Sequence, residues 1–377
     1  MKIGILTLPL CNNYGGILQA YALQTVLERY GNEVVVIDIA QPVPVLRIFL
    51  RIVKRFVKKY LFLRKNITIF SERKKEKEDL ITSKHTSLFI SRHIHKMTYK
   101  KYSDICESDY DAIVVGSDQV WRPDYFAGSI KHAFLDFAKG WDNIIRISYA
   151  ASFGTDDWLF TKRQTSECCY LIKKFNAVSV RELSAVDICQ KHWNIQATAV
   201  LDPTLLLLKD TYEQIVCESN IPQSPGNLLC YILDETDEKQ RIIDDIAERC
   251  NLVPFRVNSK YEDYSAQLSE RIQPPVEQWL RGFMDAKFVL TDSFHATVFS
   301  ILFKKNFYVI GNKERGITRF VSLLSQLGLE HRLISESFEM PIFSSESDWG
   351  VVDEKLDSLR RDSIDYLNAA LRRNVVF

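Results

Sequence analysis

The first 39 residues alternate between strand and helix patterns, and this alternation constrains the fold more than any other feature of the chain. Ile3–Leu8 is a short apolar run that leads into a polar loop with two glycines. Apolar residues then recur at helical spacing between Ile17 and Arg29, and Glu33–Ile39 forms a second apolar run. A strand, a helix and a strand in this order are typical of a crossover between parallel strands. The sequence therefore predicts an α/β fold with a parallel sheet.

The same alternation continues along the chain in two series. Further strand candidates of the first series lie at 111–115, 144–150, 176–180 and 198–201. A second series starts near Leu228 and includes a strand candidate at 306–310; it follows a stretch that contains three prolines between residues 202 and 227 and is typical of a link. At about 100–200 residues per domain, 377 residues suffice for two domains. We expect two Rossmann-like domains facing a cleft, at 1–205 and 206–350, and a helix within 351–377 that packs back on the first domain.

The composition is that of a globular protein and argues against several classes of function. Lys and Arg number 49 against 48 Asp and Glu, so a basic nucleic-acid binder is not expected. The eight cysteines include no CxxC pair, which argues against a zinc site and favours reduced thiols. The N-terminus lacks the features of a signal peptide, and no run approaches the ~18 apolar residues of a membrane span. We expect a cytoplasmic protein without a structural metal.

A basic insertion, at about 43–101, interrupts the first series. Between Val43 and Lys65 there are eight Lys or Arg residues and no acidic residue, and apolar residues lie between them at helical spacing. This pattern describes a basic amphipathic helix that can lie on an anionic membrane surface. It equally describes a helix that packs on its own domain and keeps its lysines in water. Peripheral attachment to the inner face of the membrane is therefore one of two interpretations.

Four polar segments follow predicted strands, at the sheet edge where open α/β sheets bind their ligands. The first contains Asn13, Tyr14 and Gly15, where backbone N–H groups can approach an anion or a sugar. The glycines of this loop can equally serve only a tight turn. The segment is therefore a weak predictor of a binding site when it is considered alone.

The second segment, Gly116–Trp121, carries side chains that suit a sugar. Asp118 and Gln119 can bind sugar hydroxyls, and Trp121 can stack on an apolar sugar face. In the alternative interpretation, Ser117 or Asp118 caps a helix and Trp121 belongs to the core.

The remaining segments carry cations and a histidine. Arg181 follows a strand and can present its guanidinium to a carboxylate or phosphate, or pair with an acidic neighbour. Ser293 stands at a helix start and His295 lies in its first turn, where a histidine is expected to stay neutral and able to accept a proton. Arg315 and Arg319 follow a later strand and can bind a phosphate or form a solvated cluster.

Taken in order, these segments resemble the polysaccharide pyruvyl transferase family across most of the chain. The resemblance implies a fold like that of the two-domain GT-B glycosyltransferases. It also implies transfer of the enolpyruvyl group of phosphoenolpyruvate onto two hydroxyls of a sugar in a cell-surface polysaccharide precursor, which forms a pyruvate ketal and releases phosphate. The acceptor would be a glycan or a lipid-linked sugar, and we expect this reaction to need no organic cofactor and no obligatory metal. The matching stretches are residues 1–39, Gly116–Trp121, Ser148–Gly154, Val178–Glu182, Val200–Thr204 and Thr291–His295.

The resemblance also assigns roles to residues. His295 matches the functional histidine of the family, and Arg181 matches an arginine that binds the donor. Many members carry a further arginine two residues before the histidine, where this chain has Ser293. Another cation must then hold the donor here, and Arg315 and Arg319 are the candidates. The predicted acceptor-binding residues are Asn13, Tyr14, Gly15, Asp118, Gln119 and Trp121.

The sequence is also compatible with two other functions. A GT-B glycosyltransferase would bind a nucleotide sugar in place of phosphoenolpyruvate. A catalytically silent, glycan-binding member of a polysaccharide assembly complex would have lost its donor site, and Ser293 would mark that loss.

Overall fold

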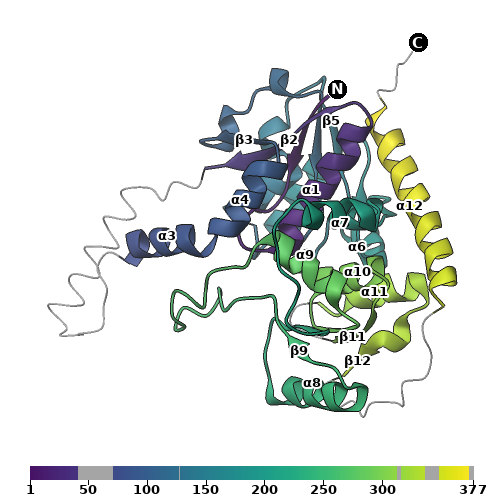
Figure 1. Ribbon diagram of the computed structural model, residues 1–377. Helices are drawn as coiled ribbons and strands as arrows, with labels where there is room; N and C mark the ends of the chain where they lie inside the picture. The colour runs from purple at the N-terminus through teal and green to yellow at the C-terminus, as the bar shows by residue number, and fades with distance from the viewer. Residues whose placement is uncertain (41–70, 127, 312–315, 336–347, 373–377) are drawn as a thin grey trace.

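Two parallel five-stranded sheets organise the chain (Figure 1). The computed structural model describes residues 1–40, 71–126, 128–311, 316–335 and 348–372. The first sheet has the strand order β3-β2-β1-β4-β5 and the second has the order β12-β11-β10-β8-β9. The strands of the first sheet are β1 (Lys2–Leu6), β2 (Glu33–Ile39), β3 (Lys96–Tyr99), β4 (Ala112–Val115) and β5 (Ile145–Ser148); those of the second are β8 (Leu228–Tyr231), β9 (Pro254–Phe255), β10 (Phe288–Thr291), β11 (Asn306–Ile310) and β12 (Leu333–Ile334).

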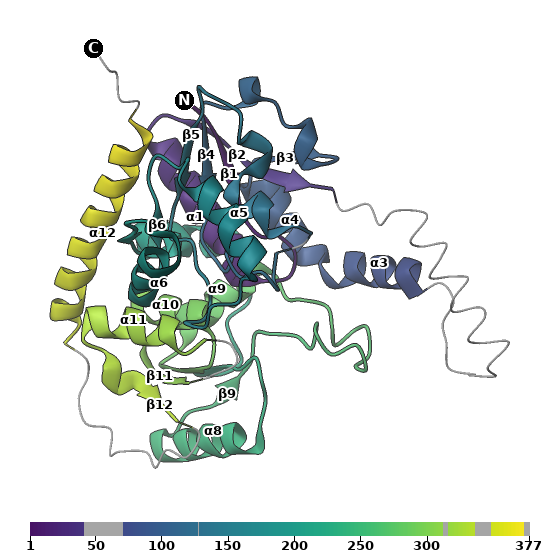
Figure 2. The same cartoon turned by 180° about the vertical axis from the view of Figure 1, so that it is seen from behind.

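The helices connect and cover these strands (Figures 1 and 2). Parallel neighbours need a crossover connection, and helices supply most of them here. The described α-helices are α1 (Tyr14–Arg29), α3 (Ser71–Thr82), α4 (Lys84–His93), α5 (Lys162–Ile172), α6 (Leu183–Trp193), α7 (Lys209–Cys217), α8 (Asp237–Cys250), α9 (Val276–Asp285), α10 (Phe294–Leu302), α11 (Thr318–Leu327) and α12 (Trp349–Leu371).

Helices pack on both faces of the first sheet, because successive strand residues point to opposite faces. In β4, Ala112 and Val114 join a core with α1 and α4, whereas Ile113 and Val115 join a second core with α5 and α6. All four side chains are fully buried. This is why the strand is continuously apolar, as strands covered on both faces usually are.

The second sheet repeats this arrangement. Leu229 and Val289 pack with α9 and α10, whereas Leu228 and Leu290 pack against α8 on the other face. The predicted α/β architecture, with two Rossmann-like halves in a GT-B-like arrangement, is confirmed. Residues 306–310 form the strand that the sequence predicts, while the predicted strands at 176–180 and 198–201 shrink to the two-residue pair β6 (Ser179–Val180) and β7 (Thr198–Ala199).

The loop after β1 leads directly into α1, which starts at Tyr14 rather than at the predicted Ile17. Asn13 is the N-cap, and its Oδ1 accepts a hydrogen bond of 3.2 Å from the backbone N–H of Gly16. This cap satisfies one of the amides that the first helical turn leaves without a partner. As a result, both glycines belong to the first turn of α1 and not to the loop.

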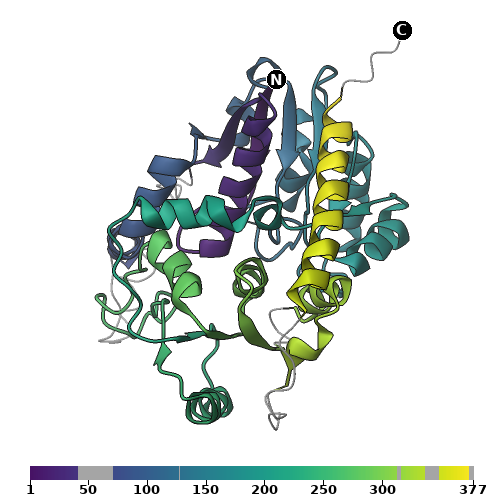
Figure 3. The same ribbon diagram turned by 45° about the vertical axis from the view of Figure 1, so that its right-hand side comes forward.

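One hydrophobic core runs through both halves, since α1 and β1 share it with α9, α10 and β10. The last helix, α12, also joins the two halves and runs alongside both (Figure 3). It contacts the first half through the hydroxyl of Tyr366, which donates to the carbonyl of Ser148 over 3.1 Å. The Ser363 hydroxyl accepts from the backbone N–H of Leu201 over 3.0 Å.

The insertion contributes α3, α4 and β3 to the described residues, and α3 extends away from the body of the molecule (Figure 1). The basic segment between Val43 and Lys65 lies outside the described residues. Among the helices that the structure describes, none is long and apolar enough to cross a membrane.

Candidate active site

A cavity of about 220 Å³ lies between the two halves and brings several of the predicted residues together. The first half contributes the loop before α1 and the segment after β4. The second half contributes the segment from β10 into α10, together with α11 and the loop after β9. The cavity is lined by Asn12, Asn13, Gly15, Asp118, Gln119 and Tyr125 from the first half, and by Tyr231, Leu233, Tyr261, Glu262, Trp279, Asp292, Ser293, Phe294, His295 and Arg319 from the second.

His295 lies in the first turn of α10, and its side chain is mostly buried against the first half of the chain. The contact is with Gly15 in the first turn of α1. A Cβ atom at Gly15 would lie only 1.9 Å from Nδ1 of the imidazole and 2.3 Å from its Cγ. Gly15 is therefore required here because the ring occupies the space of a side chain. This contact joins one predicted site residue from each half of the molecule.

Asp202 lies beside the same imidazole, and the sequence assigned it no role. Its Oδ2 is 3.6 Å from Nε2 of His295 and accepts a hydrogen bond of 3.1 Å from the Ser117 hydroxyl. The other oxygen accepts from the backbone N–H and the hydroxyl of Thr204, over 3.0 and 2.6 Å. Burial alone would raise the pKa of Asp202, but His295 and Arg181 hold it well below its ordinary range. The carboxylate is thus ionised and fixed in place.

Arg181 follows β6 and is buried behind the cavity rather than on its wall. Its Nη1 donates to Oδ2 of Asp202 over 2.9 Å, and its Nε lies 3.4 Å from Oε1 of Glu182. Burial alone would lower the pKa of Arg181, but these two carboxylates raise it above its ordinary value. The guanidinium also lies 4.3 Å from the centre of the Phe294 ring. Arg181 therefore stabilises the carboxylate beside His295.

Arg319, on α11, places a second buried guanidinium on the cavity wall. Its central carbon lies 5.6 Å from the ring centre of Phe294, the same ring that Arg181 faces. Burial and the like charge of Arg181 lower the pKa of Arg319 to about 10. The carboxylates of Glu182 and Asp118 act in the opposite direction, and a bound anion would add to their effect. Arg315, the other predicted cation, lies outside the described residues.

Asp118 faces the cavity from an unusual backbone conformation, with a φ of 71°. Left-handed backbone is uncommon for residues other than glycine and is frequent at functional sites. The Nδ2 of Asn13 donates to Oδ2 of Asp118 over 3.5 Å. The neighbouring Gln119 lines the cavity and contacts Gly154, where a Cβ would lie 1.9 Å from its Oε1.

Ser293 occupies the N-cap position of α10 and lines the cavity, but its side chain makes no capping hydrogen bond. Asp292 does not cap the helix either. It accepts hydrogen bonds from the backbone N–H groups of Leu233 and Asp234, over 2.7 and 3.1 Å, and from Nζ of Lys239 over 2.9 Å. This buried network holds the carboxyl ends of β8 and β10 together at the floor of the cavity.

The positions of two predicted acceptor residues require a correction. Tyr14 is 1% exposed, donates its hydroxyl to the carbonyl of Pro274 over 2.7 Å and stacks on Trp279. Trp121 is fully buried among Phe134, Phe153 and Trp193, and its indole N–H donates to a backbone carbonyl. Neither side chain lines the cavity, so neither can contact a sugar there. The Tyr14 hydroxyl and the Trp121 indole N–H both form hydrogen bonds inside the core. For Trp121, this is the core position that the sequence offered as the alternative to sugar binding.

The described part of the chain contains no group of three or more His, Cys, Asp or Glu side chains that could hold a metal ion. The ionisable groups around the cavity include the imidazole of His295, the carboxylates of Asp118, Glu262 and Asp292, and the guanidinium of Arg319, with Asp202 and Arg181 buried behind them. Such a set suits proton transfer next to a bound anion.

A family model described as polysaccharide pyruvyl transferase matches residues 13–314. This stretch includes all of the described cavity residues except Asn12 and Arg319. Among curated proteins, none matches the chain.

Solved structures with a similar arrangement share little sequence with this chain. A UDP-GlcNAc 2-epimerase from Methanocaldococcus jannaschii is 11% identical, with a TM-score of 0.47, and the match covers 95% of this chain and 92% of that one. Arabidopsis thaliana UGT89C1, complexed with UDP-L-rhamnose, is 11% identical with a TM-score of 0.46, covering 98% and 97%. Acinetobacter baumannii MurG is 9% identical with a TM-score of 0.42, covering 97% of each chain. Likenesses this weak carry no conclusion about chemistry.

Proposed function

Since the chain belongs to the polysaccharide pyruvyl transferase family, we propose that it transfers the pyruvyl group of phosphoenolpyruvate onto two hydroxyls of one sugar in a cell-surface glycan precursor. The observation that carries the proposal is the placement of His295 between the two halves. Its imidazole contacts Gly15 of the first half, lies 3.6 Å from the buried carboxylate of Asp202 and shares a cavity with Arg319.

The reaction requires proton transfer in both directions. The methylene carbon of phosphoenolpyruvate takes up a proton and becomes a methyl group, while one sugar hydroxyl forms a C–O bond to the neighbouring carbon and gives up its proton. The bond between this carbon and the phosphate oxygen then breaks, and the second hydroxyl closes the ketal ring and loses its proton. Of the two protons that the hydroxyls lose, one balances the proton taken up by the methylene carbon and the other leaves with the phosphate. A group that donates and accepts protons near neutral pH suits this sequence.

His295 is the proposed acid and base, and Asp202 is its positioning residue. The carboxylate lies 3.6 Å from one ring nitrogen, so its negative charge stabilises the protonated form of the imidazole when that form arises. Gly15 fixes the other side of the ring through direct contact. Asp118 is the proposed residue that orients the acceptor hydroxyls, since it lines the same cavity from the opposite half.

Arg319 is the proposed donor-binding cation of the described residues. Phosphoenolpyruvate carries a phosphate and a carboxylate, so its site needs fixed positive charge. In members with an arginine two residues before the histidine, that side chain would supply the charge, and Ser293 cannot. Arg319 reaches the cavity from α11 and is destabilised by burial and by Arg181, so a bound anion would stabilise it.

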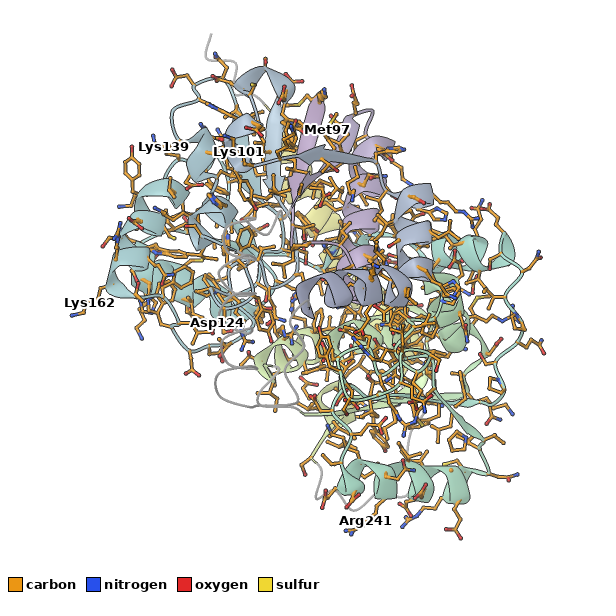
Figure 4. The ribbon with its side chains drawn as sticks, turned by 90° about the vertical axis from the view of Figure 1, so that its left-hand side faces the viewer. Met97, Lys101, Asp124, Lys139, Lys162 and Arg241 are labelled. Carbon is orange, nitrogen blue, oxygen red and sulfur yellow. The ribbon has the colours of Figure 1, made fainter. Side chains whose placement is uncertain are left out.

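Calorimetry with phosphoenolpyruvate and a panel of nucleotide sugars tests the donor. We expect binding of phosphoenolpyruvate, weakened about 10-fold or more in Arg319→Gln, because one charge-assisted hydrogen bond contributes roughly 1.5–3 kcal/mol. Arg241→Gln is the matched control, since Arg241 lies on α8 at the far end of the second half and points into solvent (Figure 4). Binding of a nucleotide sugar without binding of phosphoenolpyruvate would favour a glycosyltransferase instead.

Phosphate release by the wild type and by His295→Asn distinguishes a pyruvyl transferase from a catalytically silent protein. In a pyruvyl transferase, this variant binds phosphoenolpyruvate but releases no phosphate in the presence of an acceptor that the wild type uses. A wild type that binds glycans and never consumes phosphoenolpyruvate, with any acceptor of a broad panel, would favour the silent protein.

We also propose that the protein works in the cytoplasm, peripherally at an anionic membrane, where a lipid-linked acceptor would be found. The proposal is based on the sequence of the basic segment between Val43 and Lys65. Sedimentation with anionic vesicles tests it, with Arg51, Lys54, Arg55 and Lys58 replaced by Glu as the comparison. Equal sedimentation of both proteins would contradict membrane binding by this segment.

A further inference from the structure

A groove of about 540 Å³ continues from the cavity along the second half of the molecule. The two hollows share Tyr231, Leu233, Tyr261 and Glu262 in their walls, so a ligand can extend from one into the other. We propose that this groove binds a second, uncharged sugar unit, next to the sugar that receives the pyruvyl group. This inference rests on the proposed function and names the class of acceptor, which is a neutral oligosaccharide rather than a single sugar.

The size of the cavity supports an extended acceptor. At about 220 Å³, it has less than half the volume of the groove and must also hold the donor. Small-molecule sites usually occupy about 300–1,000 Å³, so the cavity alone is small for a donor and an acceptor together. The groove supplies the additional space on the side where the cavity is continuous with it.

The wall of the groove is held in place by contacts with the segment before α1. Ser259 donates its hydroxyl to Oε1 of Gln273 over 2.6 Å, and Nε2 of Gln273 donates to the carbonyl of Asn12 over 2.9 Å. Asn12 also lines the cavity that contains His295. Groove and cavity are therefore fixed relative to each other, as binding of one ligand across both requires.

A contact with the insertion supports the same loop from outside. Arg271 is 3% exposed and its Nη1 donates to Oε2 of Glu78 on α3 over 2.9 Å. Its guanidinium also lies 4.6 Å from the centre of the Tyr264 ring. The loop that forms the groove is thus supported on both sides before any ligand arrives.

The polar side chains of the groove suit sugar hydroxyls. Asn258 lines the groove and donates its Nδ2 to the carbonyl of Ile232 over 3.0 Å, which fixes the amide plane. Ser259 adds a hydroxyl, and Tyr261 adds an aromatic ring at the junction with the cavity. An amide, a hydroxyl and an aromatic ring together match a ligand that carries hydroxyls and has apolar ring faces.

The charge of the groove disfavours an anionic ligand. Of the described residues that line it, four are acidic and two are basic. Both basic side chains are paired within the groove, Arg256 with Glu235 over 3.0 Å and Lys260 with Glu270 over 3.1 Å. A uronic acid or the diphosphate of a nucleotide sugar would meet net repulsion here, whereas a neutral sugar would not. The preference for an uncharged unit follows from this imbalance.

Steady-state kinetics with three matched acceptors test the inference. The first is a methyl glycoside of a neutral hexose that the enzyme accepts, the second is a neutral disaccharide ending in that hexose, and the third carries a uronic acid as its second unit. Phosphate release from phosphoenolpyruvate is the readout. We expect kcat/KM to be about 10-fold higher for the neutral disaccharide than for the methyl glycoside, a contribution of about 1.4 kcal/mol. The acidic disaccharide should lose this advantage.

Variants of groove residues outside the cavity then locate the effect. Asn258→Ala should bring the ratio of kcat/KM between neutral disaccharide and methyl glycoside close to one. Asn220→Ala, at an exposed position in the link between the halves, is the control and should leave the ratio unchanged. The side chain of Glu235 is 63% exposed, so Glu235→Gln should fold normally and should reduce the difference in kcat/KM between the neutral and the acidic disaccharide.

The outcomes separate this inference from the function on which it rests. Equal kcat/KM for the methyl glycoside and the neutral disaccharide would overturn the groove as a sugar subsite and leave pyruvyl transfer intact. An acidic disaccharide that matches the neutral one would overturn the preference for an uncharged unit. Binding of phosphoenolpyruvate without phosphate release, for every acceptor of a broad panel, would remove the proposed function and this inference with it.

Discussion

Replacing Gly15 by alanine tests the contact that joins the two halves at the proposed catalytic histidine. The new Cβ would lie 1.9 Å from Nδ1 of His295, 2.3 Å from Cγ and 2.5 Å from Cε1. Ordinary contact begins at about 3.4 Å, so the ring must move by roughly 1.5 Å. The backbone of Gly15 is helical, which alanine adopts readily, so the collision with the ring is the main consequence of the substitution.

The expected loss is mainly one of activity. A displacement of about 1 Å in a reacting group lowers the rate about 100-fold, or by roughly 2.7 kcal/mol in the activation free energy. Overpacking costs about 1–3 kcal/mol of unfolding free energy, while alanine in place of glycine within a helix gains about 1 kcal/mol. We therefore expect kcat for phosphate release to fall about 100-fold, with a decrease of about 2 kcal/mol or less in the unfolding free energy.

Gly16→Ala is the matched control in the next position of the same helix. Its Cβ would meet its nearest neighbour, Nδ2 of Asn13, at 3.4 Å, an ordinary contact. This variant should keep kcat within a few-fold of the wild type and retain its stability. The measurements are steady-state phosphate release and urea denaturation of all three proteins. A Gly15→Ala protein that folds and keeps wild-type kcat would refute the argument, because the position of His295 would then not matter for the reaction.

Two further predictions concern buried groups around the site. Because the folded-state pKa of Asp202 is depressed, the stability that its carboxylate contributes is present above about pH 4 and is lost as the pH falls. Between about pH 4 and pH 2, the unfolding free energy of the wild type should therefore fall more steeply than that of Asp202→Asn, by up to about 1.4 kcal/mol per pH unit, and equal slopes in urea denaturation would contradict this. Gly316→Ala combines a φ of +88° with a Cβ only 2.0 Å from the carbonyl oxygen of Gly154 in the other half, so we expect a loss of more than about 2 kcal/mol in unfolding free energy. Gly31→Ala has a similar φ of +80° and nothing within 4 Å, so it should lose only about 1 kcal/mol, and equal losses would mean that the contact with Gly154 has no weight.

The sequence predicts the fold well because the fold depends on local patterns. Apolar runs of strand length alternate with helical periodicity, and β11 lies where the pattern places it. Helix starts are less certain, since the glycines before Ile17 indicate a loop until the cap from Asn13 is known. The predicted strands at 176–180 and 198–201 are shorter in the structure because only Ser179–Val180 and Thr198–Ala199 pair as a continuous ladder, while Ala177 joins β5 through an isolated bridge.

The candidate site is harder to predict because it is formed between distant segments. The sequence selects Asp118, His295 and Arg319 from their positions after strands, and the cavity contains all three. It does not select Asp202, because nothing local shows that this carboxylate approaches His295 from the other half. The only signal was the position of Asp202 within a segment that resembles the family. Trp121 fails for the opposite reason, since a residue after a strand can turn into the core as easily as toward a ligand.

NMR of the reaction product determines whether this protein makes a pyruvate ketal. The protein is incubated with ¹³C-labelled phosphoenolpyruvate and an acceptor panel of neutral glycosides and oligosaccharides. We expect the methylene signal of the donor to be replaced by the methyl signal of a ketal, with one phosphate released per ketal, and His295→Asn to form neither product. Transfer of a sugar from a nucleotide sugar, with phosphoenolpyruvate left unchanged, would contradict pyruvyl transfer by this protein.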